Sequence, residues 1–327
     1  MDAIRIGVLG AARITPAAVI RPARVTAEAE VVAIAARDRG RADTFAAKHG
    51  VPQVLGDYAA LIASPEIDAV YNPLPNGLHA RWTDAALEAG KHVLCEKPLT
   101  ANAAEAEQNA ATAARTGLVL MEAFHWRYHP LATRMLEIVR GGELGALRHV
   151  SAAMCFPLPI FSDIRYQYEL GGGALMDAGC YAVHMVRTLG GEEPEVVSAT
   201  SKLRGPDIDR AMRAELRFPS GYTGSIETSM WSTSVLKLQA RVVGERGELR
   251  VFNPTNPQMY HRVRVTVDGQ TRTEHVPRVK TYDVQLEAFC AAVLRGEPTL
   301  TPPSDSVANM RVIDAIYRAA GMKVRGT

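Results

Sequence analysis

The first 125 residues alternate short apolar runs with longer segments rich in Ala, Glu, Lys and Arg, and this alternation constrains the fold more than any other feature. Continuous apolar runs are typical of strands that are covered on both faces. The longer segments end at Gly50, Gly90 and Gly117, and glycine just beyond a helix supplies a left-handed cap. The pattern therefore predicts βαβ units and a doubly wound parallel sheet. The expected strands are Ile4–Leu9, Val31–Ala36, Ala69–Asn72, Val93–Cys95 and Leu118–Met121, and the expected helices are Arg39–His49, Leu78–Ala89 and Ala101–Thr116.

The rhythm changes beyond residue 146, where turn signals such as "FPSGY", "GERGE" and "VDGQT" separate short strand-like runs. Short loops between strands favour antiparallel neighbours, so we expect an open, mostly antiparallel sheet with flanking helices. Two helices close the chain, at about Tyr282–Leu294 and Ser304–Ala320. The expected strands are Val196–Leu203, Ala211–Phe218, Thr223–Met230, Leu238–Val243, Leu249–Phe252, Val263–Val267 and Thr271–Val276.

Composition excludes several classes of protein. At 327 residues the chain is too long for one ordinary core, and its 47% hydrophobic content is ample for two. No segment approaches the roughly 20 apolar residues of a membrane span. The N-terminal "MDAIRIGVLG" is interpreted as the first strand and not as a secretory signal. The net charge of +2 and the lack of a basic run predict no nucleic-acid partner, and four scattered cysteines without CxxC pairing favour a reduced, cytoplasmic protein.

The turn "IGVLGAARIT" after the first expected strand is the first motif with chemical meaning. A dinucleotide-binding turn needs a glycine after the strand, a small residue beside the pyrophosphate and a helix N-terminus aimed at it. Gly10 and Ala12 occupy the first two positions of such a motif, and Thr15 occupies the third. A plain strand-to-helix turn remains the alternative, but the place of the motif in the sheet favours dinucleotide binding. We therefore predict a dinucleotide-binding domain over residues 1–125, and a substrate-binding and oligomerisation domain of α+β type over residues 126–327.

The end of the second strand, "VVAIAARDRGR", determines which cofactor is preferred. An NAD-selective site places an acid there to hold the ribose 2′-hydroxyl. This strand ends at Ala36, and Arg37 follows, with Arg41 one helix turn later. The two arginines favour NADP, while NAD remains possible because Asp38 also lies in this loop.

Two further stretches carry polar residues that suggest catalysis. "KHVLCEKP" delivers Lys97 to the carboxyl edge of the sheet, where ligands of open α/β sheets bind, and Pro98 restricts the backbone of Lys97. In "GGGALMDAGCYAVH" the residues Asp177, Tyr181 and His184 follow a helical i, i+4, i+7 spacing and share one face. A surface salt bridge and a capping carboxylate are the structural alternatives for Lys97 and Asp177.

Together these motifs make the chain resemble the Gfo/Idh/MocA oxidoreductases over essentially its whole length. The matching pieces are "GVLGAARI", "YNPLPNGLHARW", "EKP", "MEAFHWRYHP" and "GGGALMDAGCYAVH". Many relatives carry His four residues after the Asp, whereas Tyr181 is similar to the branch of glucose–fructose oxidoreductase, aldose (xylose) dehydrogenases and dimeric dihydrodiol dehydrogenase. The resemblance implies hydride transfer between nicotinamide C4 and a carbinol or carbonyl carbon of a sugar or cyclic polyol.

The resemblance also implies roles for individual residues. Lys97, Tyr181 and Asp177 are the expected catalytic residues, and a cis bond is expected between Lys97 and Pro98. A lysine ammonium beside a tyrosine favours the phenolate, which makes Tyr181 a usable base. The expected substrate contacts are Arg127, Arg165, Asp177 and His184, and the expected cofactor contacts are Gly10, Ala12, Arg13, Ile14, Arg37, Arg41, Pro73, Asn76, His79, Glu96 and Lys97.

Three reactions remain open within this class: aldose oxidation, keto-sugar reduction and trans-dihydrodiol oxidation. A non-catalytic sensor that binds a dinucleotide and a sugar is the alternative function, but such a sensor has no need of a lysine–tyrosine pair. The remaining histidines have no metal-ligand spacing, so no metal site is expected. Strands such as "VRVTV" and "LKLQARVV" predict an uncovered apolar sheet face, and with it a homodimer or homotetramer.

Overall fold

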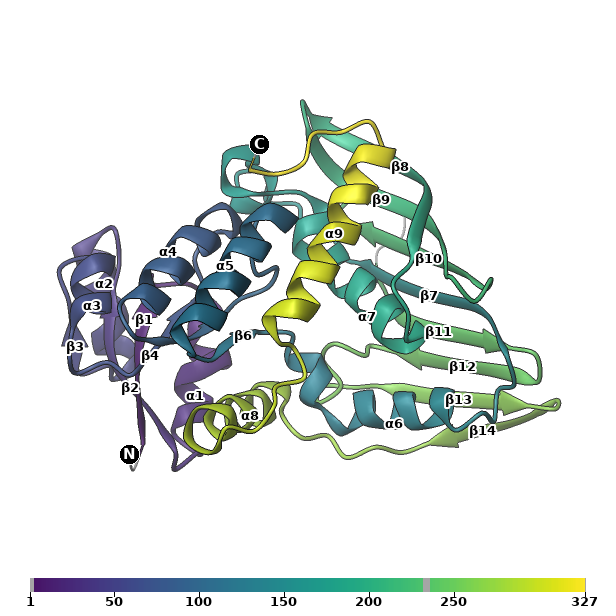
Figure 1. Ribbon diagram of the computed structural model, residues 1–327, viewed down its shortest axis with the longest axis horizontal. Coiled ribbons are helices and arrows are strands. Elements are labelled where there is room, and N and C mark those ends of the chain that lie inside the picture. Colours follow the sequence, from purple (N-terminus) through teal and green to yellow (C-terminus); the bar gives the residue numbers. More distant parts are fainter. Residues whose placement is uncertain (1–2, 232–235, 327) are drawn as a thin grey trace. The chain divides into compact units, whose positions relative to one another are not determined.

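The structure, a computed structural model, describes residues 3–231 and 236–326, and the chain divides into two compact units (Figure 1). The first unit comprises Met1–Tyr128 and Lys280–Val307, and the second comprises His129–Val279 and Ala308–Thr327.

The first unit contains the predicted doubly wound sheet. Its six strands are ordered β3-β2-β1-β4-β5-β6, and all the paired strands run parallel. Between β1 and β4 the strand order reverses direction, which is the switch point where such sheets bind ligands. The strands are β1 (Ile4–Leu9), β2 (Ala29–Ala35), β3 (Gln53–Val54), β4 (Ala69–Asn72), β5 (His92–Cys95) and β6 (Leu120–Glu122).

The helices of this unit begin and end largely where the sequence predicts. Gly50 and Gly117 adopt the left-handed conformation at the C-caps of α2 and α5, as expected for glycine just beyond a helix. The short elements β3 and α3 were not predicted, because they are too brief to show a period. The helices are η1 (Pro16–Ile20), α1 (Arg21–Ala23), α2 (Arg39–His49), α3 (Tyr58–Ala63), α4 (Asn76–Glu88), α5 (Ala103–Thr116), η2 (His125–Tyr128) and α8 (Thr281–Arg295).

Helix α8 belongs to the first unit although it lies far along the chain. Leu286, Phe289 and Cys290 are fully buried in the same apolar cluster as Ile4 and Ile6 of β1. The sequence-based division at residue 126 placed this helix with the second half. The compact units differ from that division because the packing of one helix face, and not chain order, determines where the helix lies.

The second unit contains an eight-stranded sheet, ordered β14-β13-β12-β11-β7-β10-β9-β8. All neighbours are antiparallel except β7 and β10, which run parallel, so the expectation of a mostly antiparallel sheet is confirmed. Strand β7 was not predicted, because its sequence "LRHVSAAMC" is largely small and polar. The strands are β7 (Leu147–Cys155), β8 (Glu195–Gly205), β9 (Ile208–Arg217), β10 (Thr223–Ser229), β11 (Lys237–Gly244), β12 (Gly247–Phe252), β13 (Arg262–Val267) and β14 (Gln270–Glu274).

Helix α7 packs against β7, β10 and β11, on one face of this sheet (Figure 1). A π-helical turn, η5, leads directly into α7. The helical elements are α6 (Pro130–Arg140), η3 (Ile164–Tyr166), η4 (Tyr168–Leu170), η5 (Leu175–Gly179), α7 (Cys180–Gly190) and α9 (Pro303–Ala319), which begins in the first unit. Among the described residues, no helix is both long and apolar enough to cross a membrane.

The other face of the eight-stranded sheet carries many charged side chains on its central strands, where we expected a broadly apolar surface. Exposed large apolar side chains on its strands include Val197 and Leu203 on β8 and Phe252 on β12. Glu227 on β10 accepts from Arg213 at 2.7 Å and from Lys237 at 2.6 Å. Arg241 pairs in the same way with Glu248 on the next strand. On β13 the buried Val263 and Val265 alternate with the exposed Arg262 and Arg264, so the apolar side chains point to the covered face and the charged ones to the open face.

Candidate active site

The loop after β1 has the geometry of a phosphate-binding turn. Gly10 has a φ of +88°, and a Cβ there would lie 3.1 Å from Leu74 Cδ2. The conformation and the close approach both favour glycine. The hydroxyl of Thr15 is buried at the N-cap of η1 and has no hydrogen-bond partner among the residues that the structure describes. A buried polar group without a partner at a helix N-terminus fits an anionic ligand such as a pyrophosphate.

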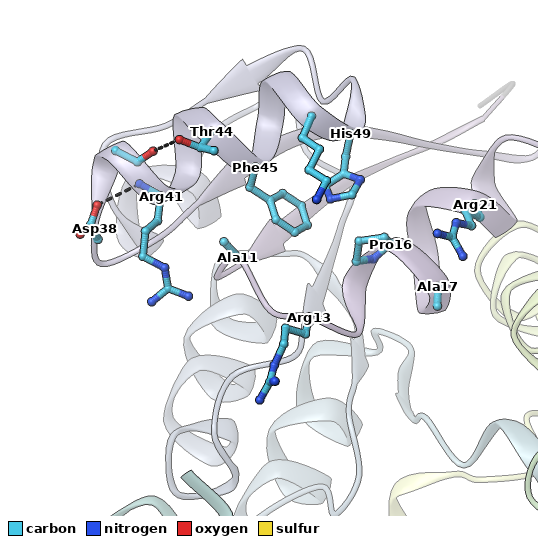
Figure 2. A pocket seen from close by; sticks show the side chains of 12 residues that line it. Ala11, Arg13, Pro16, Ala17, Arg21, Asp38, Arg41, Thr44, Phe45 and His49 are labelled. Carbon is cyan, nitrogen blue, oxygen red and sulfur yellow. Dashed lines mark hydrogen bonds between the residues drawn. The ribbon is translucent and has the colours of Figure 1, made fainter. Parts of the chain in front are cut away.

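Beside this loop lies a hollow of about 830 Å³, between the start of η1 and helix α2 (Figure 2). Its charged side chains are mostly cationic. Asp38, the one acid among the described residues that line it, caps α2 by accepting from the Arg41 amide at 2.9 Å. The carboxylate of Asp38 therefore already accepts a hydrogen bond from the first turn of α2. Arg37 is exposed and is not among the residues that line the hollow. The lining residues with ionisable side chains are Arg13, Arg21, Asp38, Arg41, Lys48 and His49.

The cations of this hollow act on His49, whose pKa lies below its usual value. Desolvation is the largest cause that lowers the pKa of His49, and the neighbouring positive charges of Lys48 and Arg21 lower it further. The ring of Phe45 lies beside that of His49, with 4.5 Å between the ring centroids (Figure 2). The hollow thus combines positive potential with an apolar surface, which suits an anionic group attached to a flat ring system.

The Glu96–Thr100 loop carries Lys97 at the end of β5, and the bond between Lys97 and Pro98 is cis, as the resemblance implied. Glu96 is buried and accepts a hydrogen bond of 2.8 Å from the hydroxyl of Tyr71 on β4. Burial, followed by the charge of Glu96, holds the pKa of Tyr71 well above its usual value, so its hydroxyl stays a donor. The amide of Leu99 donates to Glu122 at 2.8 Å.

His79 holds the same loop from α4. Its Nδ1 lies 2.8 Å from the carbonyl oxygen of Pro98, and its Nε2 lies 2.6 Å from that of Leu74. The side chain is fully buried, and burial lowers its pKa to about 4. A neutral ring has one N–H and donates to one of these carbonyls at a time. The expected cofactor contact is therefore corrected: His79 has no exposed surface and instead positions the backbone around Lys97.

The other cofactor candidates of this unit are distributed around the same edge of the sheet. Pro73 is buried just after β4, and Asn76 opens α4 with partial exposure. Ala12 is partly exposed, whereas Arg13 and Ile14 are exposed on the loop after β1. Arg127 is half-buried in η2, at the end of the unit.

In the second unit, Asp177 pairs with Arg165. The Arg165 Nε lies 2.9 Å from Asp177 Oδ1, and the Arg165 Nη1 lies 3.0 Å from Asp163 Oδ1. The charge of Asp177 is the first cause that raises the pKa of Arg165. Two of the predicted substrate residues, Asp177 and Arg165, thus form an ion pair. Asp163, which orients the arginine, was not predicted because nothing in its local sequence distinguishes it from a turn residue.

Tyr181 and His184 lie within α7, with 8% and 1% of their surface exposed. Asp177 lies one turn earlier, in η5, so the regular α-helical spacing assumed from the sequence is interrupted by a π-helical turn. Such turns are frequent at functional sites. Among the described residues, no group of three or more His, Cys, Asp or Glu side chains is arranged to hold a metal ion.

The two units match sequence profiles of one family. Residues 4–124 match the oxidoreductase family with an NAD-binding Rossmann fold, and residues 132–250 match the GFO/IDH/MocA C-terminal domain. The parallel sheet, the glycine turn after β1 and these matches define an NAD(P)-dependent oxidoreductase that acts on CH–OH groups. The chain belongs to the Gfo/Idh/MocA oxidoreductase family.

Relatives of known activity act on sugars or related diols. The chain is 40% identical to D-xylose 1-dehydrogenase (NADP(+)) 2 of Haloferax volcanii, over 96% of each sequence. It is 34% identical to trans-1,2-dihydrobenzene-1,2-diol dehydrogenase of Xenopus tropicalis, over 76% of this chain and 73% of that one. A 3-ketoreductase of Actinomadura kijaniata, solved with NADP and TDP-benzene, superposes with a TM-score of 0.91 at 32% identity, over 97% of this chain and 98% of that one. Further structures of that ketoreductase have a lysine replaced by alanine or glutamate, or a tyrosine 84 positions later replaced by phenylalanine.

The buried, neutral state of His79 predicts a pH dependence of stability. Its pKa of about 4 lies below the ordinary 6.5, so between these values the unfolded chain binds a proton that the folded chain does not. Stability should therefore be lost as pH falls from 6.5 towards 4. His79→Gln removes this loss, so the free energy of unfolding should fall about 2 kcal/mol less between pH 7 and pH 5 than in the wild type.

Urea unfolding at pH 5 and pH 7 measures the free energy of unfolding of both proteins. Taking the difference between the two pH values for each protein cancels any loss of stability that the substitution causes at every pH. Burial also lowers the pKa of His129 to about 4, but that residue is present in both proteins. If the free energy of unfolding of His79→Gln changes between pH 5 and pH 7 by as much as that of the wild type, His79 is not the source of the pH dependence.

Proposed function

We propose that the protein is an NADP-dependent sugar oxidoreductase in which Tyr181 transfers the proton and Lys97 supplies the charge that activates it. The observation that carries this proposal is a spacing: Lys97 and Tyr181 are 84 positions apart in this chain, the separation found between the replaced lysine and tyrosine of the structurally similar ketoreductase. Both residues also lie on segments that the local structure holds firmly, the loop after β5 and the first turn of α7.

The chemistry requires a base for the hydroxyl proton. When bound, the nicotinamide accepts or donates the hydride. A free tyrosine, with a pKa of about 10, is a poor base near neutral pH. An ammonium group beside the phenol favours the phenolate, and lowering the pKa by ~3 units takes ~4 kcal/mol of differential interaction. We assign the ammonium to Lys97, which would also stabilise a developing alkoxide on the substrate.

Asp177 is proposed to accept a hydrogen bond from a second substrate hydroxyl. Its pairing with Arg165 supports this role, because the ion pair fixes the position of one of its oxygens. Arg127 and His184 are the further proposed substrate contacts. The proposed cofactor contacts are Gly10, Ala12, Arg13, Ile14, Arg37, Arg41, Pro73, Asn76, Glu96 and Lys97.

Sugars are the proposed substrate class, since the relatives include a xylose dehydrogenase and a sugar ketoreductase. Trans-dihydrodiol oxidation is the second candidate, supported by the 34% identity to a dihydrodiol dehydrogenase. Absorbance at 340 nm, with aldoses, keto-sugars and dihydrodiols and both cofactors, separates these candidates. Cofactor binding without turnover of any of them would favour the sensor.

Substitution of the proposed pair tests the mechanism. Tyr181→Phe removes the hydroxyl and keeps the ring, so kcat should fall roughly 10²–10⁴-fold while cofactor binding, measured by fluorescence quenching, is retained. Lys97→Met should cost about as much, and the double variant little more, because the two side chains act as one unit. Steady-state kinetics measure all three.

The control is His184→Ala, on the same helix. If Tyr181→Phe keeps near-wild-type kcat while His184→Ala loses it, His184 is the base and Tyr181 is a packed ring.

Cofactor preference provides another prediction. Arg41 borders the cationic hollow and Arg37 follows β2, so one or both should meet the 2′-phosphate of NADP. Arg41→Ala and Arg37→Ala should together raise KM for NADP about 10–100-fold, the value of a charge-assisted hydrogen bond, and leave KM for NAD unchanged.

Arg39→Ala is the matched control, because Arg39 pairs with Asp43 on the outer side of α2 and does not line the hollow. The NADP proposal is wrong if the wild type has a higher kcat/KM with NAD.

We also propose that two copies of the chain associate through the open face of the eight-stranded sheet. Because that face carries charges of both signs, self-complementary ion pairs across a two-fold axis would be screened by salt. Light scattering should give twice the 35.4 kDa chain mass in low salt and a lower mass in 1 M NaCl. A mass of one chain at micromolar concentration in low salt refutes the proposal.

A further inference from the structure

A buried ion pair, Asp209–Arg325, lies directly behind the glycine turn that precedes Asp177. The Arg325 Nη2 lies 2.8 Å from Asp209 Oδ1, and neither side chain has any exposed surface. The hydroxyl of Tyr317 donates to the same carboxylate oxygen at 3.0 Å. The guanidinium also lies over the rings of Tyr317 and Tyr168, at 4.2 and 5.0 Å from their centroids.

Both members of this pair bond to the backbone of the turn. The Arg325 Nε donates to the Gly172 carbonyl at 2.7 Å, and Asp209 Oδ2 accepts from the Leu175 amide at 2.7 Å. Leu175 is the first residue of the π-helical turn that contains Asp177. Two strong, charge-assisted hydrogen bonds thus tie the turn and the start of η5 to one buried cluster.

The close packing of this cluster explains why glycine occupies positions 172 and 173. A Cβ at Gly173 would overlap Asp209 Oδ1 and lie 2.8 Å from the Tyr317 hydroxyl, and its φ of +131° favours glycine as well. A Cβ at Gly172 would lie 2.7 Å from the carbonyl oxygens of Arg165 and Gln167. The glycines therefore allow the buried pair and the preceding loop to approach the backbone.

The bonds continue from the turn to the proposed site. The Asp177 amide donates to the Gly173 carbonyl at 3.0 Å, and the Gly173 amide donates to the carbonyl of Arg165 at 2.8 Å. Arg165 in turn pairs with the carboxylate of Asp177. Any displacement of Gly172 and Gly173 moves the backbone of both partners of that ion pair.

We propose that Asp209 and Arg325 are positioning residues for the reaction: they fix the glycine turn and the start of η5, and thereby the placement of Asp177 and of Tyr181 in the next helix turn. This inference rests on the proposed function, since it assumes that Asp177 and Tyr181 face the substrate. A displacement of about 1 Å at a reacting group costs up to 10²-fold in rate, so a rigid support behind the turn has a direct effect on kcat.

The charge of the cluster matters as well as its shape. Burial raises the pKa of Asp209 to about 6, and the charge of Arg325 opposes that rise. Removing the guanidinium would leave a carboxylate buried without its cation, and removing the carboxylate would leave the reverse. A neutral replacement of either partner should therefore loosen the turn.

The test uses Arg325→Met, Arg325→Lys and Tyr317→Phe in the full chain. Arg325→Met should lower kcat 10- to 100-fold, with the dissociation constant of the cofactor unchanged. Arg325→Lys, which keeps the charge but cannot bond Asp209 and Gly172 in the same planar geometry, should recover part of the loss. Hydrogen exchange should accelerate in the peptide 171–181 of Arg325→Met.

Arg134→Met is the matched control. Arg134 forms a two-bond pair with Glu274, at 2.6 and 2.9 Å, on β14 at the opposite end of the sheet from β9. It should lower the melting temperature without changing kcat or exchange in the peptide 171–181.

Wild-type kcat in folded Arg325→Met would overturn the proposal, and so would unchanged exchange in the peptide 171–181. If Arg325→Met does not fold, Tyr317→Phe and Arg325→Lys decide the question, since each removes only part of the cluster. Both variants should accelerate exchange in the peptide 171–181 and lower kcat. Wild-type exchange and kcat in both variants would overturn the proposal. Failure of the proposed function is distinguishable, because Tyr181→Phe would then keep its kcat while Arg325→Met still accelerates exchange.

Discussion

Buried polar side chains that bond to backbone groups hold the two loops on which the proposed chemistry depends. In the first unit, His79 contacts the Pro98 carbonyl and Glu122 accepts from the Leu99 amide, so the loop that carries Lys97 is held from two sides. In the second unit, Asp209 and Arg325 do the same for the turn before Asp177. A buried polar group without a partner costs roughly 1–3 kcal/mol, so each of these bonds resists any movement of the loop it holds.

The cofactor side of the protein depends on a different effect, the accumulation of like charge. The hollow beside the glycine turn after β1 gathers arginine and lysine side chains, while Asp38 caps α2. Repulsion between these cations raises the free energy of the folded chain, and a bound anionic ligand would offset that repulsion. The buried hydroxyl of Thr15, which no side chain or backbone group in residues 3–231 and 236–326 bonds, is a second group that a bound phosphate would satisfy.

The sequence predicted the elements whose signal is local. Strand β1 and helix α2 have the predicted bounds, because an apolar run and a glycine cap are visible in a few neighbouring residues. Strand β7 was missed, although it lies in the middle of its sheet, because its small and polar residues carry no strand signal. The charges on the open face were not predicted, since a run such as "RVRVTV" does not itself say which neighbours its arginines meet.

The sequence by itself determined the doubly wound sheet, the glycine turn after β1, and the positions of Lys97, Asp177 and Tyr181 on their segments, because each depends on residue order and spacing. Only the tertiary structure decided that Asp38 caps a helix, that His79 supports a loop, and that the glycines before Asp177 make room for a buried ion pair. Asp209 and Arg325 are 116 positions apart. Burial, and the partners that long-range packing brings to a side chain, are properties of the folded chain, so no local pattern could have revealed them.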